Sequence, residues 1–216
     1  MSATIKYAAM SRRAAMTAAA MAAMVTLSGC NGGGAGKAAE GDMALGAPEG
    51  AKVTVVEYAS VTCPHCATWQ EETWPAFKAA YVDTNKVRFV FRELPTPPTE
   101  VAVAGFLVAR CAGGVENYFN VIHELMADQR NLVTDPRTTL FRVGNGLGMN
   151  QQRIQDCITD EAALQASEER AKAAMSAGVT GTPTFFVNDV KVITPGGEGA
   201  SLEDLSKAID AELAKG

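Results

Sequence analysis

Residues 53–66 read VTVVEYASVTCPHC, and this stretch decides the fold. Residues 53–58 are rich in β-branched side chains, which predicts a buried strand. Pro64 is well placed to begin a helix, because the N–H that proline lacks has no helical partner in the first turn. Cys63 therefore lies at a helix N-terminus, where free N–H groups and the positive end of the helix dipole favour a thiolate. We expect the pKa of the Cys63 thiol to be lowered.

Cys66 lies one helical turn beyond Cys63, within disulfide reach. A Cys-x-x-Cys pair on a strand-to-helix turn is typical of redox motifs. A zinc site is one alternative, but structural zinc needs two further ligands. The chain has no second Cys-x-x-Cys, and its only histidines are His65 and His123. A purely structural disulfide is the other alternative, and so short a loop would remove little entropy from the unfolded chain.

A second stretch far downstream, residues 178–188, reads GVTGTPTFFVN: a turn, a proline and then an apolar strand. Together with the Cys63–Cys66 motif, Gly181-Thr182-Pro183-Thr184-Phe185 resembles the thioredoxin superfamily, and specifically the DsbA family of bacterial envelope disulfide oxidoreductases. The resemblance implies that Pro183 is cis and faces the cysteine pair. It also implies that the backbone of Thr182 hydrogen-bonds a bound substrate segment. Without the cysteines, Pro183 would indicate only an ordinary turn before an edge strand.

The resemblance covers roughly residues 42–215 and implies the fold class, an α/β thioredoxin fold with an inserted all-helical domain. The thioredoxin domain would comprise residues 42–94 and 178–216, and the helical domain residues 95–177. The sequence pattern agrees, because residues 99–177 contain almost no strand signal. At 216 residues and 47% apolar content the chain can bury one sizeable core. We expect no cofactor and no metal ion.

Hydrophobic periodicity and turn residues predict the individual elements. The expected strands are residues 42–45, 53–58, 87–94, 184–188 and 191–193. The expected helices are residues 64–82, 100–112, 115–129, 136–147, 151–159 and 161–177. Ser201 is expected to cap a last amphipathic helix, with Asp204 three residues on. Arg88 and Arg92 share one face of their strand, and we expect both to be solvated.

Glu57 is a polar residue within the apolar strand at residues 53–58. The resemblance implies a carboxylate beneath the active-site helix that assists proton transfer to and from the inner cysteine, Cys66. An exposed strand residue without a role in the chemistry is the alternative.

The first 29 residues have the organisation of a secretory signal peptide, with basic residues followed by the short apolar run 14–27. That run is too short for an ordinary transmembrane helix. Leu27-Ser28-Gly29-Cys30 resembles the bacterial lipobox, which implies cleavage before Cys30 and attachment of diacylglycerol to its thiol. The alternative is a free or disulfide-bonded Cys30 near an ordinary cleavage site. Residues 30–41, rich in glycine and alanine, predict a flexible tether.

The charge of the exported chain excludes some partners. Residues 1–29 hold three basic and no acidic residues, so their removal leaves 16 basic against 24 acidic residues, a formal charge of −8. That sign disfavours binding to nucleic acid and to anionic lipid surfaces. Membrane attachment would therefore come from acyl chains.

Two cysteines remain after the motif and Cys30 are assigned, namely Cys111 and Cys157. In an oxidising envelope they are candidates for a structural disulfide, which could contribute on the order of 4 kcal/mol in the chain-entropy model. Some relatives in the family carry a second disulfide in the helical region. The alternative is a pair of buried free thiols.

The function expected from these features is that of an envelope thiol:disulfide oxidoreductase, acting as an oxidant that donates the Cys63–Cys66 disulfide to exported proteins with free thiols. A substrate thiolate attacks the exposed Cys63 sulfur, and a second substrate thiolate releases Cys63 as a leaving group. Pro64 and His65 tune the potential, because an imidazolium and the helix dipole stabilise the reduced form. By resemblance, a quinone-coupled membrane partner of the DsbB type would reoxidise the pair.

Other functions remain open at this point. A reductase or isomerase shares the motif, and Thr182 before Pro183 occurs in isomerase-like relatives as well. An isomerase normally dimerises, whereas no dimerisation module is visible, so a monomer is expected. A different class is an envelope module that holds Cu(I) or Zn(II) with both thiolates, although no Met-rich or His-rich cluster accompanies the motif. The expected location is the bacterial periplasm, with a lipid anchor at the membrane.

Overall fold

The sheet at the centre of the protein has five strands in the order β1-β3-β2-β4-β5 within the part of the chain that the structure describes. The structure is a computed structural model that describes residues 35–197 and 199–215, so the predicted signal peptide and Cys30 lie outside the described residues. The strands are β1 (Met43–Gly46), β2 (Thr54–Ala59), β3 (Arg88–Glu93), β4 (Thr184–Val187) and β5 (Val190–Val192). Strands β2 and β3 are parallel, and the other neighbours are antiparallel.

The parallel pair β2 and β3 occupies the middle of the sheet and is buried on both faces. Every residue of β2 except Thr54 is buried, and Val55 lies opposite Phe89 of β3. A strand covered on both faces needs a nearly continuous apolar run, which explains why neither strand shows clean alternation in the sequence. The five strands correspond to the five predicted ones, with ends that differ by at most one residue.

The predicted helix at residues 64–82 is interrupted. It consists of α1 (Pro64–Glu72), α2 (Trp74–Phe77) and a π-helical turn η1 (Lys78–Val82). The break at Thr73 comes just before Pro75, which has no N–H for the preceding turn and crowds the carbonyl four residues earlier. The prediction of one continuous helix was therefore wrong.

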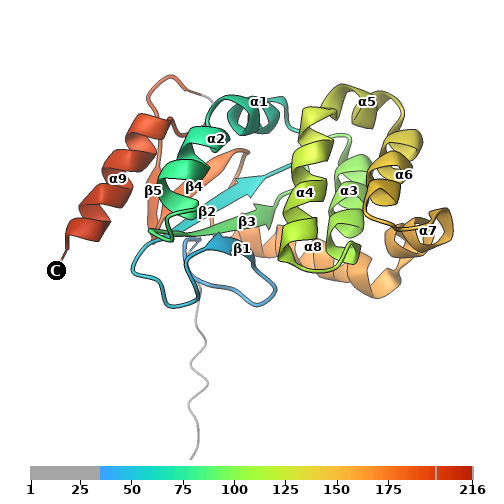
Figure 1. Cartoon of the computed structure of the whole chain (residues 1–216), viewed down its shortest axis with the longest axis horizontal. Coiled ribbons are helices and arrows are strands. Elements are labelled where there is room, and N and C mark those ends of the chain that lie inside the picture. Colours follow the sequence, from blue (N-terminus) through green and yellow to red (C-terminus); the bar gives the residue numbers. More distant parts are fainter. Residues whose placement is uncertain (1–34, 198, 216) are drawn as a thin grey trace, which may run out of the picture. The chain divides into compact units, whose positions relative to one another are not determined.

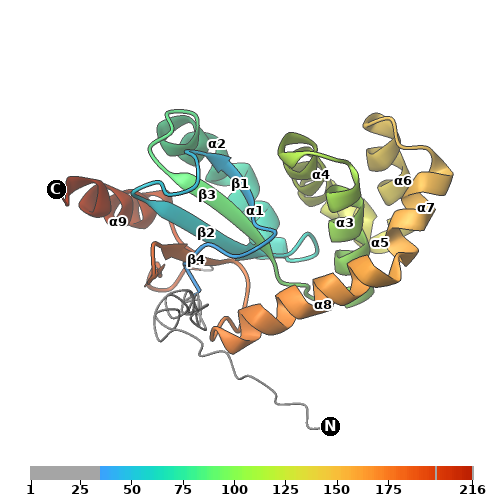
Figure 2. The same ribbon diagram turned by 90° about the horizontal axis from the view of Figure 1, so that it is seen from below.

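Six helices connect β3 to β4, in agreement with the predicted helical insertion. They are α3 (Thr99–Cys111), α4 (Val115–Ala127), α5 (Gln129–Thr134), α6 (Pro136–Gly146), α7 (Gln151–Thr159) and α8 (Glu161–Ser176). Helices α3 to α7 stand beside the sheet (Figure 1), and α8 runs beneath it toward β4 (Figure 2). The predicted helix at residues 115–129 ends early, at Ala127, because Asp128 leaves the helical conformation. The short helix α5 was not predicted.

Helix α9 (Leu202–Ala214) packs at the other end of the sheet, beside β5 (Figure 1). The Ser201 side chain accepts a hydrogen bond from the backbone N–H of Asp204, as the predicted N-cap requires. Leu205 and Ile209 are fully buried against the main core. Among the described residues, no helix is both long enough and apolar enough to cross a membrane.

Arg92 is not solvated as predicted. Its guanidinium forms an ion pair with Asp42 at 2.8 Å and donates to the Tyr58 hydroxyl and to the backbone oxygen atoms of Ala35 and Lys37. Residues 35–41 are therefore held against the sheet, and the prediction of a flexible tether does not hold for this part of residues 30–41. Sequence alone could not show this, because the partners lie 34 or more residues from Arg92.

Glu93 links the end of β3 to three of the helices. Its buried carboxylate accepts hydrogen bonds from Arg110 of α3 at 2.6 Å, Tyr118 of α4 at 3.0 Å and Arg170 of α8 at 2.8 Å. A buried carboxylate is tolerated only when its lone pairs are satisfied in this way. The Glu93 cluster thus joins the sheet to the helical insertion and fixes their relative position.

Candidate active site

The two cysteines of the motif lie where β2 passes into α1. Cys63 is the N-cap residue of α1, with extended backbone angles, and Pro64 is the first helical residue. Both cysteines are free thiols, so the structure describes the reduced form. Cys66 is completely buried, and only 6% of Cys63 is exposed. The expectation of an exposed Cys63 was therefore wrong, because neighbouring segments from elsewhere in the chain cover most of its surface.

The loop between β2 and α1 is held by hydrogen bonds on both sides. The Cys63 N–H donates to the Ser60 carbonyl at 3.1 Å. The Thr62 hydroxyl lies 3.0 Å from the Ser60 hydroxyl and donates to the Thr96 carbonyl at 2.8 Å. Thr96 belongs to the segment after β3, so the parallel neighbour of β2 helps to shape the loop that presents the cysteine.

The two thiols have opposite electrostatic environments. The pKa of Cys63 is lowered to about 5, first by its hydrogen bond with the Cys66 thiol and further by Thr182 and the backbone of Cys66 and His65, with burial opposing the shift. Burial, followed by the hydrogen bond with Cys63 and the charges of Cys63 and Glu57, raises the pKa of Cys66. Near neutral pH the reduced pair therefore carries one thiolate, on the outer sulfur.

The segment around Pro183 faces this thiolate. The Thr182–Pro183 peptide bond is cis, the form that the resemblance implies. The Thr182 carbonyl oxygen lies 3.4 Å from the Cys63 sulfur. This contact joins the two motifs, which are 119 residues apart in sequence. Pro97 and Pro98 are joined by a second cis bond that the sequence did not indicate.

A third segment, at residues 199 and 200, packs against Pro183. Gly199 has φ of 136°, and a Cβ atom there would lie 2.9 Å from Cγ of Pro183. The Trp69 indole N–H donates to the Ala200 carbonyl at 2.9 Å, and the Trp69 ring lies 4.6 Å from that of Phe185. Trp69 is buried in the core, and it also connects the active-site helix to the segment that packs against Pro183.

Glu57 is buried in β2, with 2% of its surface exposed, so the alternative of an exposed strand residue is wrong. Burial, and then the negative charge of Cys63, raises the pKa of Glu57 to about 8. Its charge in turn contributes to the raised pKa of Cys66. A carboxyl group that titrates near neutral pH next to a buried thiol can exchange a proton under physiological conditions.

Pro64 and His65 are exposed on the first turn of α1, beside the reactive sulfur. They lie at the surface that an incoming partner must approach. The backbone of His65 contributes to the lowered pKa of Cys63, as expected for a residue at a helix N-terminus.

Cys111 and Cys157 are joined in a disulfide that bridges α3 and α7, with Cα atoms 6.1 Å apart.

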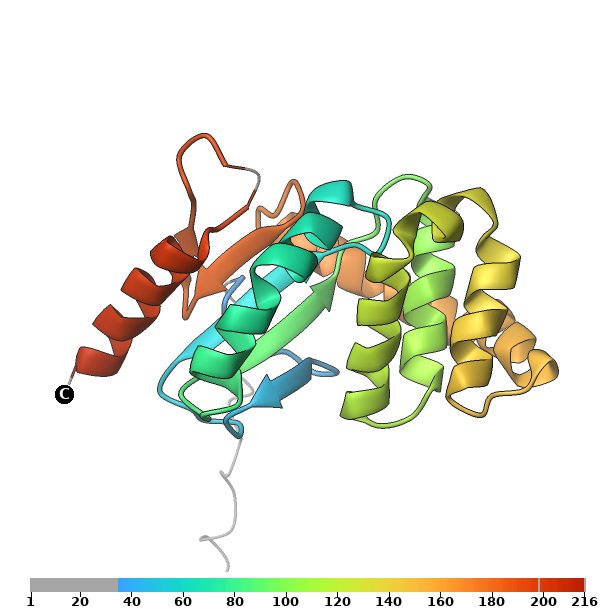
Figure 3. The same ribbon diagram turned by 45° about the horizontal axis from the view of Figure 1, so that its top comes forward.

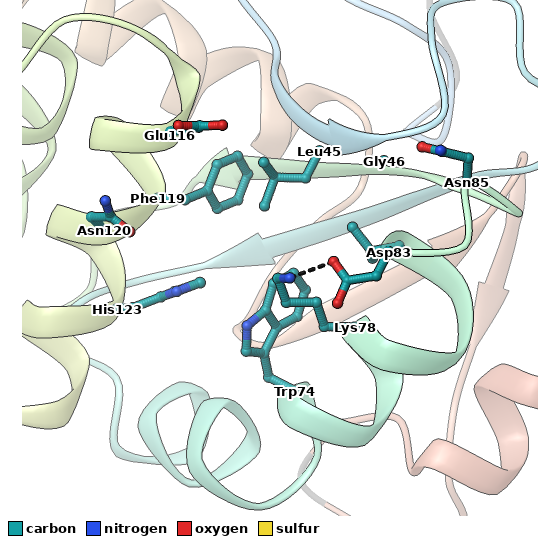
Figure 4. A pocket seen from close by; sticks show the side chains of 11 residues that line it. Leu45, Gly46, Trp74, Lys78, Asp83, Asn85, Glu116, Phe119, Asn120 and His123 are labelled. Atoms are coloured by element: carbon teal, nitrogen blue, oxygen red, sulfur yellow. Dashed lines mark hydrogen bonds and ion pairs between the residues drawn. The ribbon is translucent and has the colours of Figure 1, made fainter.

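His123 lies in α4, where Trp74 and Phe119 contact its ring. It lines a groove of about 490 Å³ between α4, α2 and η1 (Figure 4). Burial, and then the charge of Lys78, lowers the pKa of His123 to about 4, so the ring is neutral at pH 7. In the described ranges no three His, Cys, Asp or Glu side chains come together to hold a metal ion.

Comparison with known proteins agrees with this geometry. The family model described as thioredoxin matches residues 38–211, which is most of the chain. The chain belongs to the thioredoxin superfamily. A protein of Rickettsia bellii and one of Rickettsia typhi, both named as protein-disulfide oxidoreductases, are each 32% identical to it over 81% and 80% of the chain. The chain spans 65% and 62% of the lengths of these relatives.

Solved structures specify the kind of thioredoxin-like protein. The crystal structure of Wolbachia pipientis alpha-DsbA1 superposes with a TM-score of 0.72 at 26% identity, covering 82% of this chain and 94% of that one. Oxidised BdbD from Bacillus subtilis shares the fold, with a TM-score of 0.69 at 18% identity over 80% of this chain and 92% of that one. The chain is thus a DsbA-like member of the superfamily, with the predicted thioredoxin fold and helical insertion.

One side chain at the site was missed by the sequence. Gln129, at the start of α5, donates from Nε2 to the carbonyl oxygen atoms of Val61 at 2.8 Å and Cys63 at 3.0 Å. No local pattern marks a glutamine at a helix start as a partner of a segment 66 residues away. Only the packing of α5 beside the loop before α1 brings them together (Figure 3).

Proposed function

We propose that the protein is a thiol:disulfide oxidoreductase of the bacterial envelope that acts as an oxidant, donating the Cys63–Cys66 disulfide to exported proteins. The observation that carries this proposal is the opposite shift of the two thiol pKa values, with Cys63 lowered to about 5 and Cys66 raised. A stabilised thiolate favours the reduced form, and a disulfide whose reduced form is stabilised is a strong oxidant.

The reaction starts from the oxidised pair. A substrate thiolate attacks the Cys63 sulfur, the Cys63–Cys66 bond breaks, and its electron pair leaves on Cys66. A second substrate thiolate then attacks the substrate sulfur of this mixed disulfide and expels Cys63 as a thiolate. The substrate loses two electrons and gains a disulfide, while the cysteine pair is reduced. The low pKa makes Cys63 a good leaving group in the second step.

Glu57 has the position and the proton affinity to serve the first step. Cys66 leaves as a thiolate in a site where its pKa is raised, so it must gain a proton. A carboxyl group with a pKa of about 8 is largely protonated near neutral pH and can supply that proton, directly or through water.

The Thr182 backbone would bind the substrate. Its carbonyl oxygen lies 3.4 Å from the Cys63 sulfur, so an extended substrate segment paired with Thr182 would place its own cysteine next to Cys63. By resemblance, a quinone-coupled membrane protein of the DsbB type would reoxidise the pair. The DsbA-like neighbours support action in the periplasm.

The proposed anchor and oligomeric state have separate tests. Lipidation of Cys30 predicts that labelled palmitate is incorporated into the full chain and not into Cys30→Ser. Incorporation into the variant would contradict lipidation at Cys30.

The proposed monomer predicts one chain per particle in light scattering after size exclusion. A stable dimer would instead favour an isomerase.

The deciding measurement is the equilibrium reduction potential of the Cys63–Cys66 pair in glutathione buffers, on the chain from residue 31 onward. The Cys111→Ser/Cys157→Ser variant, measured in parallel, ensures that the signal comes from the active-site pair. A potential near the roughly −120 mV of a strong oxidant supports the proposal, whereas one near the roughly −270 mV of thioredoxin indicates a reductase. Stoichiometric copper or zinc in the purified protein would favour a metal-binding module instead.

A further inference from the structure

Gln129 contacts the backbone on both sides of the reactive cysteine. It is half-buried and is the first residue of α5. The two N–H groups of its amide match the two carbonyl groups that it binds, those of Val61 at 2.8 Å and Cys63 at 3.0 Å. A glutamine amide can donate two hydrogen bonds, and both are directed here at the loop that carries Cys63.

With these contacts, each of the three consecutive peptide groups between Val61 and Pro64 makes at least one hydrogen bond. Gln129 holds the carbonyl of Val61, the Cys63 N–H donates to Ser60, and the Cys63 carbonyl accepts both from Gln129 and from the Ala67 N–H. The Cys63 sulfur contacts Cys66, Thr182 and the backbone of the first turn of α1. The backbone that carries Cys63 must hold the sulfur within reach of these groups, and Gln129 is the contribution of the helical insertion to that backbone.

We propose that Gln129 is a positioning residue that holds the peptide groups around Cys63 and thereby keeps the Cys63 sulfur at the N-terminus of α1, beside Thr182. The contacts that stabilise a thiolate there, with Cys66, Thr182 and the backbone of the first turn, depend on distance and angle. Release of the two carbonyl groups would let the sulfur move away from these donors. The inference builds on the proposed function, since it concerns the same sulfur.

Two substitutions separate the hydrogen bonds from the shape of the side chain. Gln129→Met keeps the length but has no N–H to donate. Gln129→Glu removes the donors and places a negative charge beside two carbonyl oxygen atoms and close to the thiolate. Gln152→Met is the matched control, because the Gln152 amide donates to Asp156 on the exposed face of α7.

The experiment follows the thiolate of the reduced chain by ultraviolet absorbance as a function of pH, with folding checked by circular dichroism. We expect the Cys63 pKa to rise by about half to one unit in Gln129→Met and by more in Gln129→Glu, with alkylation at mildly acidic pH slowed about three- to tenfold. Gln152→Met should titrate like the wild-type chain.

Wild-type titration of both Gln129 variants would overturn the proposal, even if their melting temperatures fell, because a purely structural contact predicts that result. If Gln129→Met does not fold, Gln129→Leu takes its place, because it also lacks the two donors and adds no charge that would raise the Cys63 pKa by itself. A reduction potential close to that of thioredoxin would defeat the proposed oxidase function and leave this comparison of pKa values intact, so the two failures are distinguishable.

Discussion

The described part of the chain contains two cysteine pairs with the same functional group in very different surroundings. Cys63 and Cys66 are one helical turn apart, are free thiols in this structure and have oppositely shifted pKa values. Cys111 and Cys157 are 46 residues apart in sequence and are joined across two helices. Cys111 is the last residue of α3, and Cys157 lies within α7, so neither sits at a helix N-terminus. Among the described contacts, no buried carboxylate lies next to this pair.

The comparison shows that surroundings, more than the sulfur atoms, decide what a cysteine pair does. Reduction of the first pair yields a Cys63 thiolate that the hydrogen bond with the Cys66 thiol and the backbone of the first turn of α1 stabilise, so the pair readily transfers its disulfide to another protein. Reduction of the second pair frees a long loop in the unfolded chain and yields no comparable stabilised charge. One pair is therefore suited to exchange and the other to holding α3 and α7 together.

Loss of the outer active-site sulfur should have the largest effect. Cys63→Ser should slow the oxidation of a reduced dithiol peptide by about a thousandfold or more, because it removes the thiol whose pKa is lowered at the described site. The rate can be followed by the fluorescence of a peptide that changes on disulfide formation. Cys111→Ser/Cys157→Ser is the control and should retain most of the rate. Equal losses in the two variants would contradict the division of labour.

Loss of the second pair should appear in stability. Cys111→Ser/Cys157→Ser should lower the free energy of unfolding by up to about 4 kcal/mol in the chain-entropy model. Denaturant unfolding measures this difference. Reduction of Cys63–Cys66 alone should not lower it near neutral pH, because the thiolate stabilises the folded reduced form. A larger stability loss from the active-site pair would reverse the comparison.

Glu57 is a second difference between the two cysteine pairs, because this buried carboxyl group acts on Cys66 of the first pair. Its folded pKa of about 8 lies above the ordinary value of 4.5, so the folded state resists ionisation as pH rises through this window. Glu57→Gln should therefore raise the free energy of unfolding at pH 7 by about 3 kcal/mol. The gain should vanish near pH 4 in urea unfolding, and a gain independent of pH would indicate better packing instead.

The last expected effect is a pH dependence of the difference in stability between the two redox forms. The Cys63 pKa falls from 9.0 to about 5 on folding, so its thiolate stabilises the reduced form fully above pH 9 and not at all below pH 5. The stability of reduced relative to oxidised protein should rise across that window. Thermal unfolding of both forms of the wild-type chain tests this. Cys63→Ser, which cannot form this disulfide and has no Cys63 thiolate, should show no corresponding rise in its own stability between pH 5 and pH 9.

Much of the fold could be read from local patterns. Every strand was expected close to its observed position, because β-branched and aromatic runs bounded by turn residues are local signals. Ser201 and Asp204 placed the start of α9 for the same reason. The error at Arg92 arose because distant residues before β1 decide its surroundings. The helix break at Thr73 before Pro75 and the end of α4 at Asp128 are instead local features that the predicted helix bounds left out.

The sequence by itself determined the cysteine pair at the start of a helix and the order of strands and helices, because these depend on residue type at short range. The position of Pro183 opposite the pair was implied by the resemblance of the two motifs to a known family. Only the tertiary structure decided that Cys63 is largely buried, that Glu57 lies in the interior with a raised pKa, and that Glu93 and Gln129 connect the helices to the sheet and to the active-site loop. The physical reason is that burial and hydrogen bonding across dozens of residues arise from packing, which no local pattern encodes.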